Sequence, residues 1–120
     1  MTDLIEKIRQ GEDYFGSGGH TTPEFNKFYM DFKKAIHKKL LKIDGYHSLQ
    51  LNKGHFYISG FFSVGEQAYY ISLSDVRWNM RAPEQILVRT ASSYKDYTGG
   101  QNNYAKLSTL AEDIIRIFRL

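Results

Sequence analysis

A chain of 120 residues is long enough for one domain with its own apolar core, and aromatic residues make up 15% of it. The sequence has no cysteine, which excludes structural disulfides and zinc sites built on thiolates. A formal net charge of +3 excludes an acidic mimic of DNA and favours an anionic partner only mildly. The first residues lack the basic-then-apolar order of a secretory signal, and no apolar run approaches the roughly 20 residues of a membrane helix. We therefore expect a cytoplasmic protein without membrane contact.

Residues 1–21 are interpreted as a mobile N-terminal segment that precedes a single α+β domain over residues 22–120. Leu4, Ile5 and Ile8 favour a short extra helix within this segment. The stretch 11–21 contains four glycines, which indicates a flexible connection.

The residues Thr22, Pro23 and Glu24 predict a helix start, with a hydroxyl cap, a proline in the first turn and an early carboxylate. Apolar side chains then recur at helical spacing and predict an amphipathic helix of about 20 residues, ended by Asp44-Gly45. These side chains are Phe25, Phe28, Tyr29, Phe32, Ile36, Leu40 and Ile43.

The same helix carries Lys27, Lys34 and Lys38 along one stripe, where a nucleic-acid phosphate backbone can lie. Asp31 interrupts this stripe. The alternative is an ordinary solvated face, whose lysines also favour the negative C-terminal end of the helix dipole.

The residues from Tyr46 to Leu51 alternate in polarity and predict a strand that turns into a second one. The sequence Val64-Gly65-Glu66-Gln67 then predicts a tight turn, with glycine at the central position that needs a positive φ. Folding about this turn fixes the register of a hairpin with two unlike faces. The expected core-face pairs are Phe62 with Tyr69, Gly60 with Ile71, and Ile58 with Leu73.

The other face of this hairpin is aromatic and hydroxylated. It includes Tyr57, Phe61 and Tyr70, joined by Arg89 from a fourth strand expected over Glu84 to Ala91. Large exposed apolar patches mark interfaces, so we predict that this face binds a protein partner or forms a homodimer. Two alternatives stay open: the N-terminal segment covers the face, or its rings and arginine stack on unpaired bases.

The residues Arg77, Trp78 and Arg81 follow the third predicted strand and are of types enriched in binding hot spots. They extend the predicted protein-binding face. The alternative is structural, because Asp75 lies two residues from Arg77 and can simply pair with it.

The loop over residues 92–102 precedes a last amphipathic helix, which is expected from Tyr104 to Phe118. Gly99 and Gly100 suit a backbone nest that receives an anion at this helix start, with further contacts from Lys95 and Thr98. The alternative is a purely structural turn, because the glycine spacing fits neither a Walker loop nor a dinucleotide fingerprint.

Catalytic motifs are not recognisable in this sequence. The histidines lack a ligand spacing such as HExxH, and no G-x-S-x-G occurs. The D-x-K spacing at Asp31 falls on a predicted helix, where alternate residues diverge by about 200°. We therefore expect a chain that is not an enzyme and takes no cofactor and no metal ion.

Three segments carry a family resemblance: Gly54-His-Phe-Tyr-Ile-Ser-Gly-Phe-Phe62, Ile71-Ser-Leu-Ser-Asp-Val-Arg77, and Ile86-Leu-Val-Arg-Thr-Ala91 followed by Asp96-Tyr-Thr-Gly-Gly100. Over roughly residues 22–118 the chain resembles small accessory proteins of plasmids and phages of Gram-positive bacteria. The resemblance implies a conjugation or phage-development factor, or an antagonist of host defence such as an anti-CRISPR or antirestriction protein. It carries over no catalytic residue.

The expected fold is α+β, with a four-stranded antiparallel meander and two helices on one face in the order α-β-β-β-β-α. The expected function is non-catalytic binding of a protein through the exposed sheet face. Nucleic-acid binding through the basic helix is the alternative, and inhibition of a host defence system is a third.

Overall fold

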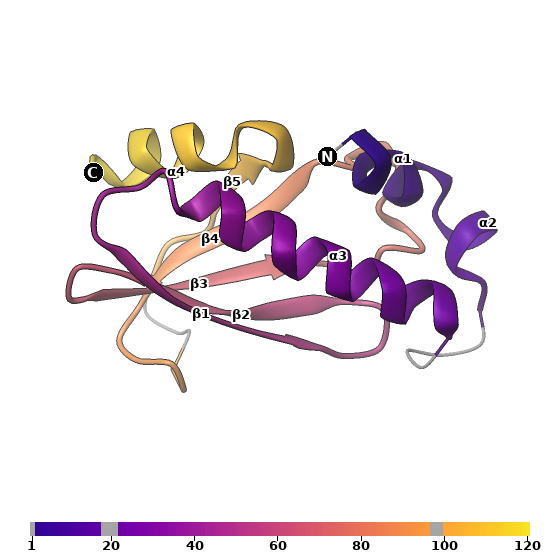
Figure 1. Ribbon diagram of the computed structural model, residues 1–120, viewed down its shortest axis with the longest axis horizontal. Coiled ribbons are helices and arrows are strands. Elements are labelled where there is room, and N and C mark those ends of the chain that lie inside the picture. Colours follow the sequence, from indigo (N-terminus) through magenta and orange to yellow (C-terminus); the bar gives the residue numbers. More distant parts are fainter. Residues whose placement is uncertain (1, 18–21, 97–99) are drawn as a thin grey trace.

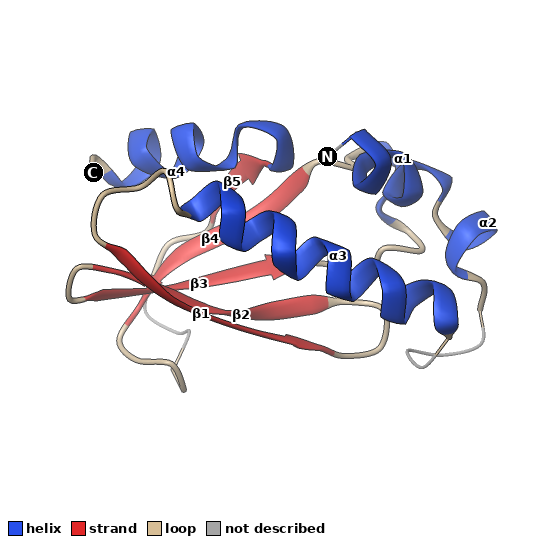
Figure 2. Ribbon diagram, in the orientation of Figure 1, coloured by secondary structure: helices blue, strands red, loops and turns tan. Residues whose placement is uncertain are grey.

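The computed structural model describes residues 2–17, 22–96 and 100–120. The helices lie on one side of a single sheet (Figure 1), and the strands run in succession from one edge to the other (Figure 2). The helices are α1 (Thr2–Gln10), α2 (Glu12–Phe15), α3 (Pro23–Leu40) and α4 (Leu110–Phe118), with 3₁₀ turns η1 (Asn79–Arg81) and η2 (Leu107–Thr109). The strands are β1 (Tyr46–Lys53), β2 (Ile58–Val64), β3 (Gln67–Leu73), β4 (Gln85–Ala91) and β5 (Asn103–Lys106).

The sheet is an antiparallel meander in the order β1-β2-β3-β4-β5, so the predicted α+β class is confirmed. Among the described residues, no helix has the length and apolar character needed to cross a bilayer.

Helix α3 is the longest helix and begins where the sequence predicts. The Thr22 side chain accepts a hydrogen bond from the Phe25 N–H at 3.2 Å, and Pro23 occupies the first turn. Phe25, Phe28 and Phe32, with Ile36 and Leu40 further along, are buried against the sheet. The helix ends at Leu40 rather than at Asp44-Gly45, although Ile43 in the following turn is also buried.

The register of the β2–β3 hairpin matches the prediction. Phe62 pairs with Tyr69, and on the opposite face Phe61 pairs with Tyr70. Gly65 has a φ of 60° in the turn, a conformation that glycine adopts without a side-chain clash. The two faces of the hairpin therefore differ as expected, one buried under the helices and one turned away from them.

The sheet has one strand more than the sequence predicts. Strand β5 pairs with β4 and places Tyr104 opposite Leu87, whereas we expected a helix from Tyr104 onward. Helix α4 starts only at Leu110, after η2. The carboxylate of Asp113 accepts hydrogen bonds from the Lys106 N–H and the Thr109 hydroxyl. These hydrogen bonds hold the connection between β5 and α4. The spacing of apolar residues alone does not reveal where this strand ends and the helix begins.

The described part of the N-terminal segment, residues 2–17, packs into the core, which differs from the prediction of a mobile segment over residues 1–21. Residues 1 and 18–21 of that prediction lie outside the described residues. Leu4 and Ile8 of α1 and Phe15 of α2 are buried in the same core as α3. The Phe15 ring centroid lies 5.1 Å from that of Phe28 in an edge-to-face contact. The physical reason is that Gly11, at a φ of 58°, makes a sharp turn between two short helices rather than a flexible linker.

The burial of Phe15 generates a stability prediction. Phe15→Ala should lower the free energy of unfolding by about 3–5 kcal/mol, because it removes a ring from a packed core and leaves a cavity. Urea unfolding followed by circular dichroism measures this change. The exposed neighbour provides a control, since Asp13→Ala should change stability by less than about 0.5 kcal/mol. A similarly small effect of Phe15→Ala would mean that the N-terminal segment does not dock.

Candidate functional site

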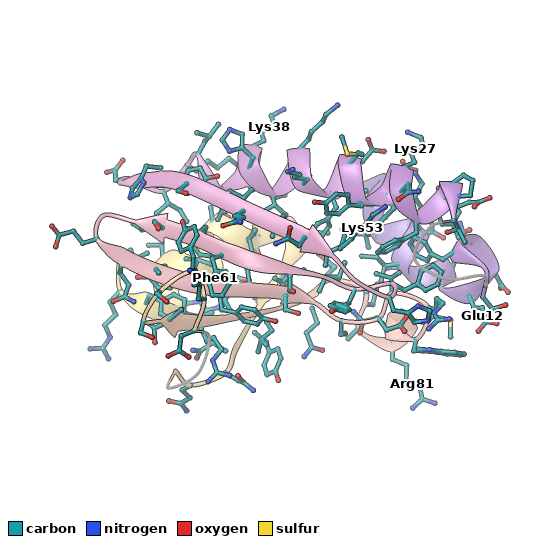
Figure 3. All side chains as sticks on the ribbon, turned by 90° about the horizontal axis from the view of Figure 1, so that it is seen from below. Glu12, Lys27, Lys38, Lys53, Phe61 and Arg81 are labelled. Atoms are coloured by element: carbon teal, nitrogen blue, oxygen red, sulfur yellow. The ribbon has the colours of Figure 1, made fainter. Side chains whose placement is uncertain are left out.

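The face of the sheet that the helices leave uncovered carries the first group of predicted site residues. Phe61, Tyr70 and Arg89 are neighbours on three adjacent strands, because Tyr70 pairs with both other residues. The Phe61 and Tyr70 ring centroids are 5.5 Å apart. Figure 3 views the molecule from this side, with Phe61 on the sheet.

The loop between β4 and β5 covers part of this face. The Tyr94 ring stacks on Phe61 at a centroid distance of 5.5 Å and an interplanar angle of 18°. The Tyr94 hydroxyl also lies 2.6 Å from the Ser63 hydroxyl, and Ser63 is buried. One alternative was that the N-terminal segment covers this face. The described residues of that segment instead pack on the helix side of the sheet. Phe61 is therefore half-buried by the chain's own loop.

Arg89 anchors the end of this loop. One guanidinium nitrogen donates to the Asn102 side-chain oxygen at 2.9 Å, and another donates to the Gly100 carbonyl. Both hydrogen bonds hold the Arg89 side chain against its own loop. This geometry disfavours the predicted stacking of Arg89 on unpaired bases. Arg89 is a positioning residue of the loop.

The predicted anion nest at Gly99 and Gly100 does not lie at the start of a helix. Thr98 and Gly99 lie outside the described residues, and Gly100 leads into strand β5 rather than into a helix N-terminus. Gly100 has a structural reason to be glycine, since a Cβ there would lie 2.4 Å from the Thr90 carbonyl oxygen. Lys95 is exposed, and its backbone N–H donates to the Ser93 hydroxyl at 3.2 Å.

The second group of predicted residues lies between β3 and β4. Arg77 and Asp75 form a bidentate ion pair, with nitrogen-to-oxygen distances of 3.1 and 2.7 Å. The hydrogen bonds to Asp75 raise the pKa of the Arg77 guanidinium. This guanidinium lies 4.3 Å from the centroid of the Phe56 ring and 5.7 Å from that of the Trp78 ring. The expected pairing of Arg77 with Asp75 is thus confirmed, and it places the guanidinium beside the Trp78 ring.

Exposed apolar side chains occur on the segments that flank this ion pair. Trp78 is 62% exposed, Met80 45% and Tyr57 43%. Tyr57 lies at the same end of the sheet, because the neighbouring Phe56 carbonyl accepts a hydrogen bond from the Val76 N–H at 2.9 Å. We call these three side chains, together with the exposed Arg81, the Trp78 surface.

The backbone beneath the Trp78 surface is strained. Phe56 is fully buried and has a φ of 62°, a left-handed conformation that a bulky residue rarely adopts. Its ring packs against Phe25 of α3 at a centroid distance of 5.1 Å. Such strain tends to occur at functional sites and persists where the surrounding packing enforces it. The Trp78 surface therefore adjoins a buried residue that the core holds in a strained conformation.

The lysine stripe of α3 is less uniform than the sequence suggests. Lys27 forms an ion pair with Asp31 at 3.1 Å, so its charge is locally compensated. Lys34 and Lys38 are exposed and have no carboxylate within ion-pair distance among the residues described. Of the three lysines in the predicted stripe, Lys34 and Lys38 thus remain as candidates for contact with a nucleic-acid phosphate.

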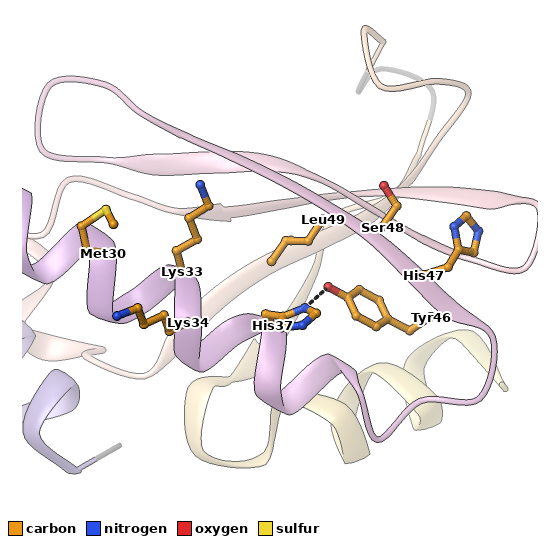
Figure 4. Close-up of a pocket in the computed structure, with 8 residues that line it drawn as sticks. All are labelled: Met30, Lys33, Lys34, His37, Tyr46, His47, Ser48 and Leu49. Atoms are coloured by element: carbon orange, nitrogen blue, oxygen red, sulfur yellow. Dashed lines mark hydrogen bonds between the residues drawn. The ribbon is translucent and has the colours of Figure 1, made fainter.

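A groove between α3 and β1 is the feature that the sequence analysis missed. It has a volume of about 390 Å³ and is lined by Met30, Lys33, Lys34, His37, Tyr46, His47, Ser48 and Leu49. Figure 4 shows how the two elements contribute these side chains. The predicted meander gave one indication of this groove. Its first strand lies at the edge of the sheet, and an edge strand can border a groove.

The histidines of this groove have local partners. His37 Nδ1 lies 2.8 Å from the Tyr46 hydroxyl, and His47 Nε2 lies 2.7 Å from the Gly65 carbonyl oxygen. Burial, with a smaller contribution from Tyr94, raises the pKa of the Tyr46 hydroxyl. Within the ranges that the structure describes, no three His, Asp or Glu side chains are grouped as metal ligands.

Comparisons with protein-family models, curated proteins and solved structures found no match to this chain.

The contact between Tyr94 and Phe61 can be tested directly. Tyr94→Ala removes the stacked ring and its hydrogen bond to Ser63, so we expect faster amide hydrogen exchange over residues 92–96. The free energy of unfolding should fall by about 1–3 kcal/mol. Lys95→Ala in the same loop is the control and should change neither quantity. Exchange rates equal to those of the unmodified chain would show that Tyr94 does not hold the loop.

Proposed function

We propose that this chain is a non-catalytic binding protein that docks onto a protein partner through the Trp78 surface. The observation that carries this proposal is the 62% exposure of Trp78, the one tryptophan of the sequence, beside Tyr57 and Met80. Phe25, Phe28 and Phe32 belong to the buried core, whereas Trp78 lies outside it.

The chemistry of the Trp78 surface suits a protein interface. Tryptophan, tyrosine and arginine are the residue types most enriched among interface hot spots, and methionine adapts to irregular partners. The ion pair with Asp75 holds Arg77 in place before binding, so little side-chain entropy is lost there. Arg81 adds a cation with no carboxylate within ion-pair distance among the described residues.

The sheet face that we first assigned to the partner has a smaller role in this proposal. The loop that carries Tyr94 shields Phe61, and Arg89 holds the end of that loop. Tyr104, which is 55% exposed on β5, is a large side chain of this face that the loop does not shield. We therefore place the centre of the interface at the Trp78 surface rather than at Phe61 and Tyr70.

The biological setting remains that implied by the resemblance. We propose a cytoplasmic accessory protein of a mobile genetic element, whose partner is a protein of the host or of the element itself. Inhibition of a host defence protein is one form of this function.

Nucleic-acid binding is the second candidate, and Lys34 and Lys38 on α3 favour it. Against it stand the pairing of Lys27 with Asp31 and the fixed position of Arg89. Binding to duplex DNA should weaken steeply with salt, with a log–log slope of about −0.9 per phosphate neutralised. Binding through the Trp78 surface should change little over the same range, which separates the two candidates.

Site-specific photo-crosslinking tests the proposed interface. A benzophenone amino acid at position 78 should yield a discrete crosslinked product in the cells that produce the chain, because this position lies at the interface centre. The control is the same probe at Leu41, which is 60% exposed at the end of α3. Arg81→Glu should reduce the product at position 78, and a product of twice the chain's mass would identify a homodimer. Identical products from positions 78 and 41, or none, would contradict the proposal.

A further inference from the structure

Strand β1 is an edge of the sheet, and its outer side faces the groove beside α3. Among the described strands β1 pairs with β2 alone, so alternate N–H and C=O groups of β1 point away from the sheet. The Leu51 carbonyl points outward in this way, since it accepts a hydrogen bond from the Tyr29 hydroxyl of α3 at 2.8 Å. Two residues earlier, Leu49 directs its backbone groups to the same side. This part of the edge borders the groove.

The groove has the size and lining of a site for an extended peptide. Its volume is about 390 Å³, and it lies between a helix and the outer edge of a strand (Figure 4). Met30 is 52% exposed on the helix side and Leu49 is half-buried on the strand side. These two side chains form an apolar floor that one side chain of a peptide can cover.

The charge of the groove is positive. Lys33 and Lys34 extend from α3, His37 and His47 flank the strand, and no carboxylate is among the lining residues. The ammonium groups of Lys33 and Lys53 both lie 5.8 Å from the centroid of the Tyr29 ring. Two like charges at one ring favour a ligand that brings negative charge between them.

We propose that this groove binds an extended acidic segment of a partner protein, which adds to β1 as a further strand. The backbone of the segment pairs with Leu49, its carboxylates face Lys33 and Lys34, and one apolar side chain packs between Met30 and Leu49. A second copy of this chain is disfavoured as the occupant, because β1 itself carries His47 and Lys53 and would bring cations together. The site is separate from the Trp78 surface and extends the proposed function.

Fluorescence anisotropy with a synthetic peptide tests this proposal. The probe is a fluorescein-labelled, end-capped peptide of about seven residues, typical of strand length. It carries Glu, Val and Glu at alternate positions, separated by Thr, so that the carboxylates and the apolar side chain share one face of the strand. We expect saturable binding and, in amide NMR spectra, a shifted and exchange-protected Leu49 N–H. Replacing every Glu by Lys should abolish binding. Methylating alternate backbone nitrogens should weaken it by at least about tenfold, because this blocks the strand hydrogen bonds while keeping the charge.

Paired protein variants separate the groove from general attraction. The double variant Lys33→Glu/Lys34→Glu should weaken binding by at least about tenfold, because it reverses the charge beside β1. Lys38→Glu/Lys42→Glu makes the same change in net charge outside the groove, and should change affinity by less than about threefold. Trp78→Ala should leave peptide binding unchanged, so that this test and the crosslinking test can fail independently.

Several results would overturn the proposal. Equal loss in the two double variants would indicate nonspecific electrostatic attraction. Unchanged affinity of the methylated peptide would exclude strand addition, and so would an unshifted Leu49 N–H. Absence of peptide binding, with a single-stranded oligonucleotide binding in its place and losing affinity in Lys33→Glu/Lys34→Glu, would assign the groove to nucleic acid.

Discussion

The packing of the α3 phenylalanines against the sheet is the interaction on which the rest of the structure depends. Phe25, Phe28 and Phe32 are buried on one side of the helix, and the Phe28 and Phe32 ring centroids are 5.7 Å apart. Phe15 from the N-terminal segment and Phe56 from the β1–β2 connection pack onto the same rings. Burial of this aromatic area fixes the helical layer on one face of the sheet. Among the residues that the structure describes, it is the loop with Tyr94 that covers part of the opposite face.

This one-sided arrangement explains where the candidate binding surfaces lie. The Tyr94 loop shields the middle of the open face, and Arg89 secures its end. Besides Tyr104 on β5, the exposed candidates are the Trp78 surface at one end of the sheet and the groove beside the edge strand β1. Both adjoin α3, because Phe56 beneath Trp78 packs on Phe25 and the groove is lined by the outer side of the helix. The helix thus supports both surfaces.

Local patterns predicted the elements whose side chains have a clear period. Thr22-Pro23 and the repeated phenylalanines defined the start and the buried side of α3, and strict alternation about Gly65 defined the hairpin register. Strand β5 was missed because four residues are too few to establish a period, and the apolar spacing from Tyr104 also fits a helix. The cover of Phe61 by Tyr94 and the docking of Phe15 depend on contacts between distant residues, which no local pattern encodes. The sequence therefore predicted the exposed rings of the face but not which of them the chain itself covers.

The Trp78 surface depends on the exposure of Trp78 to solvent at the end of the sheet. Because the sequence has one tryptophan, its fluorescence reports on this exposure directly. The most direct measurement is the fluorescence of the folded chain with acrylamide as quencher. We expect red-shifted emission that is quenched almost as fast as that of a free indole and that changes little when urea unfolds the chain. Blue-shifted emission that resists quenching until unfolding would place Trp78 inside the monomer or a constitutive oligomer, and would contradict a surface open to a partner.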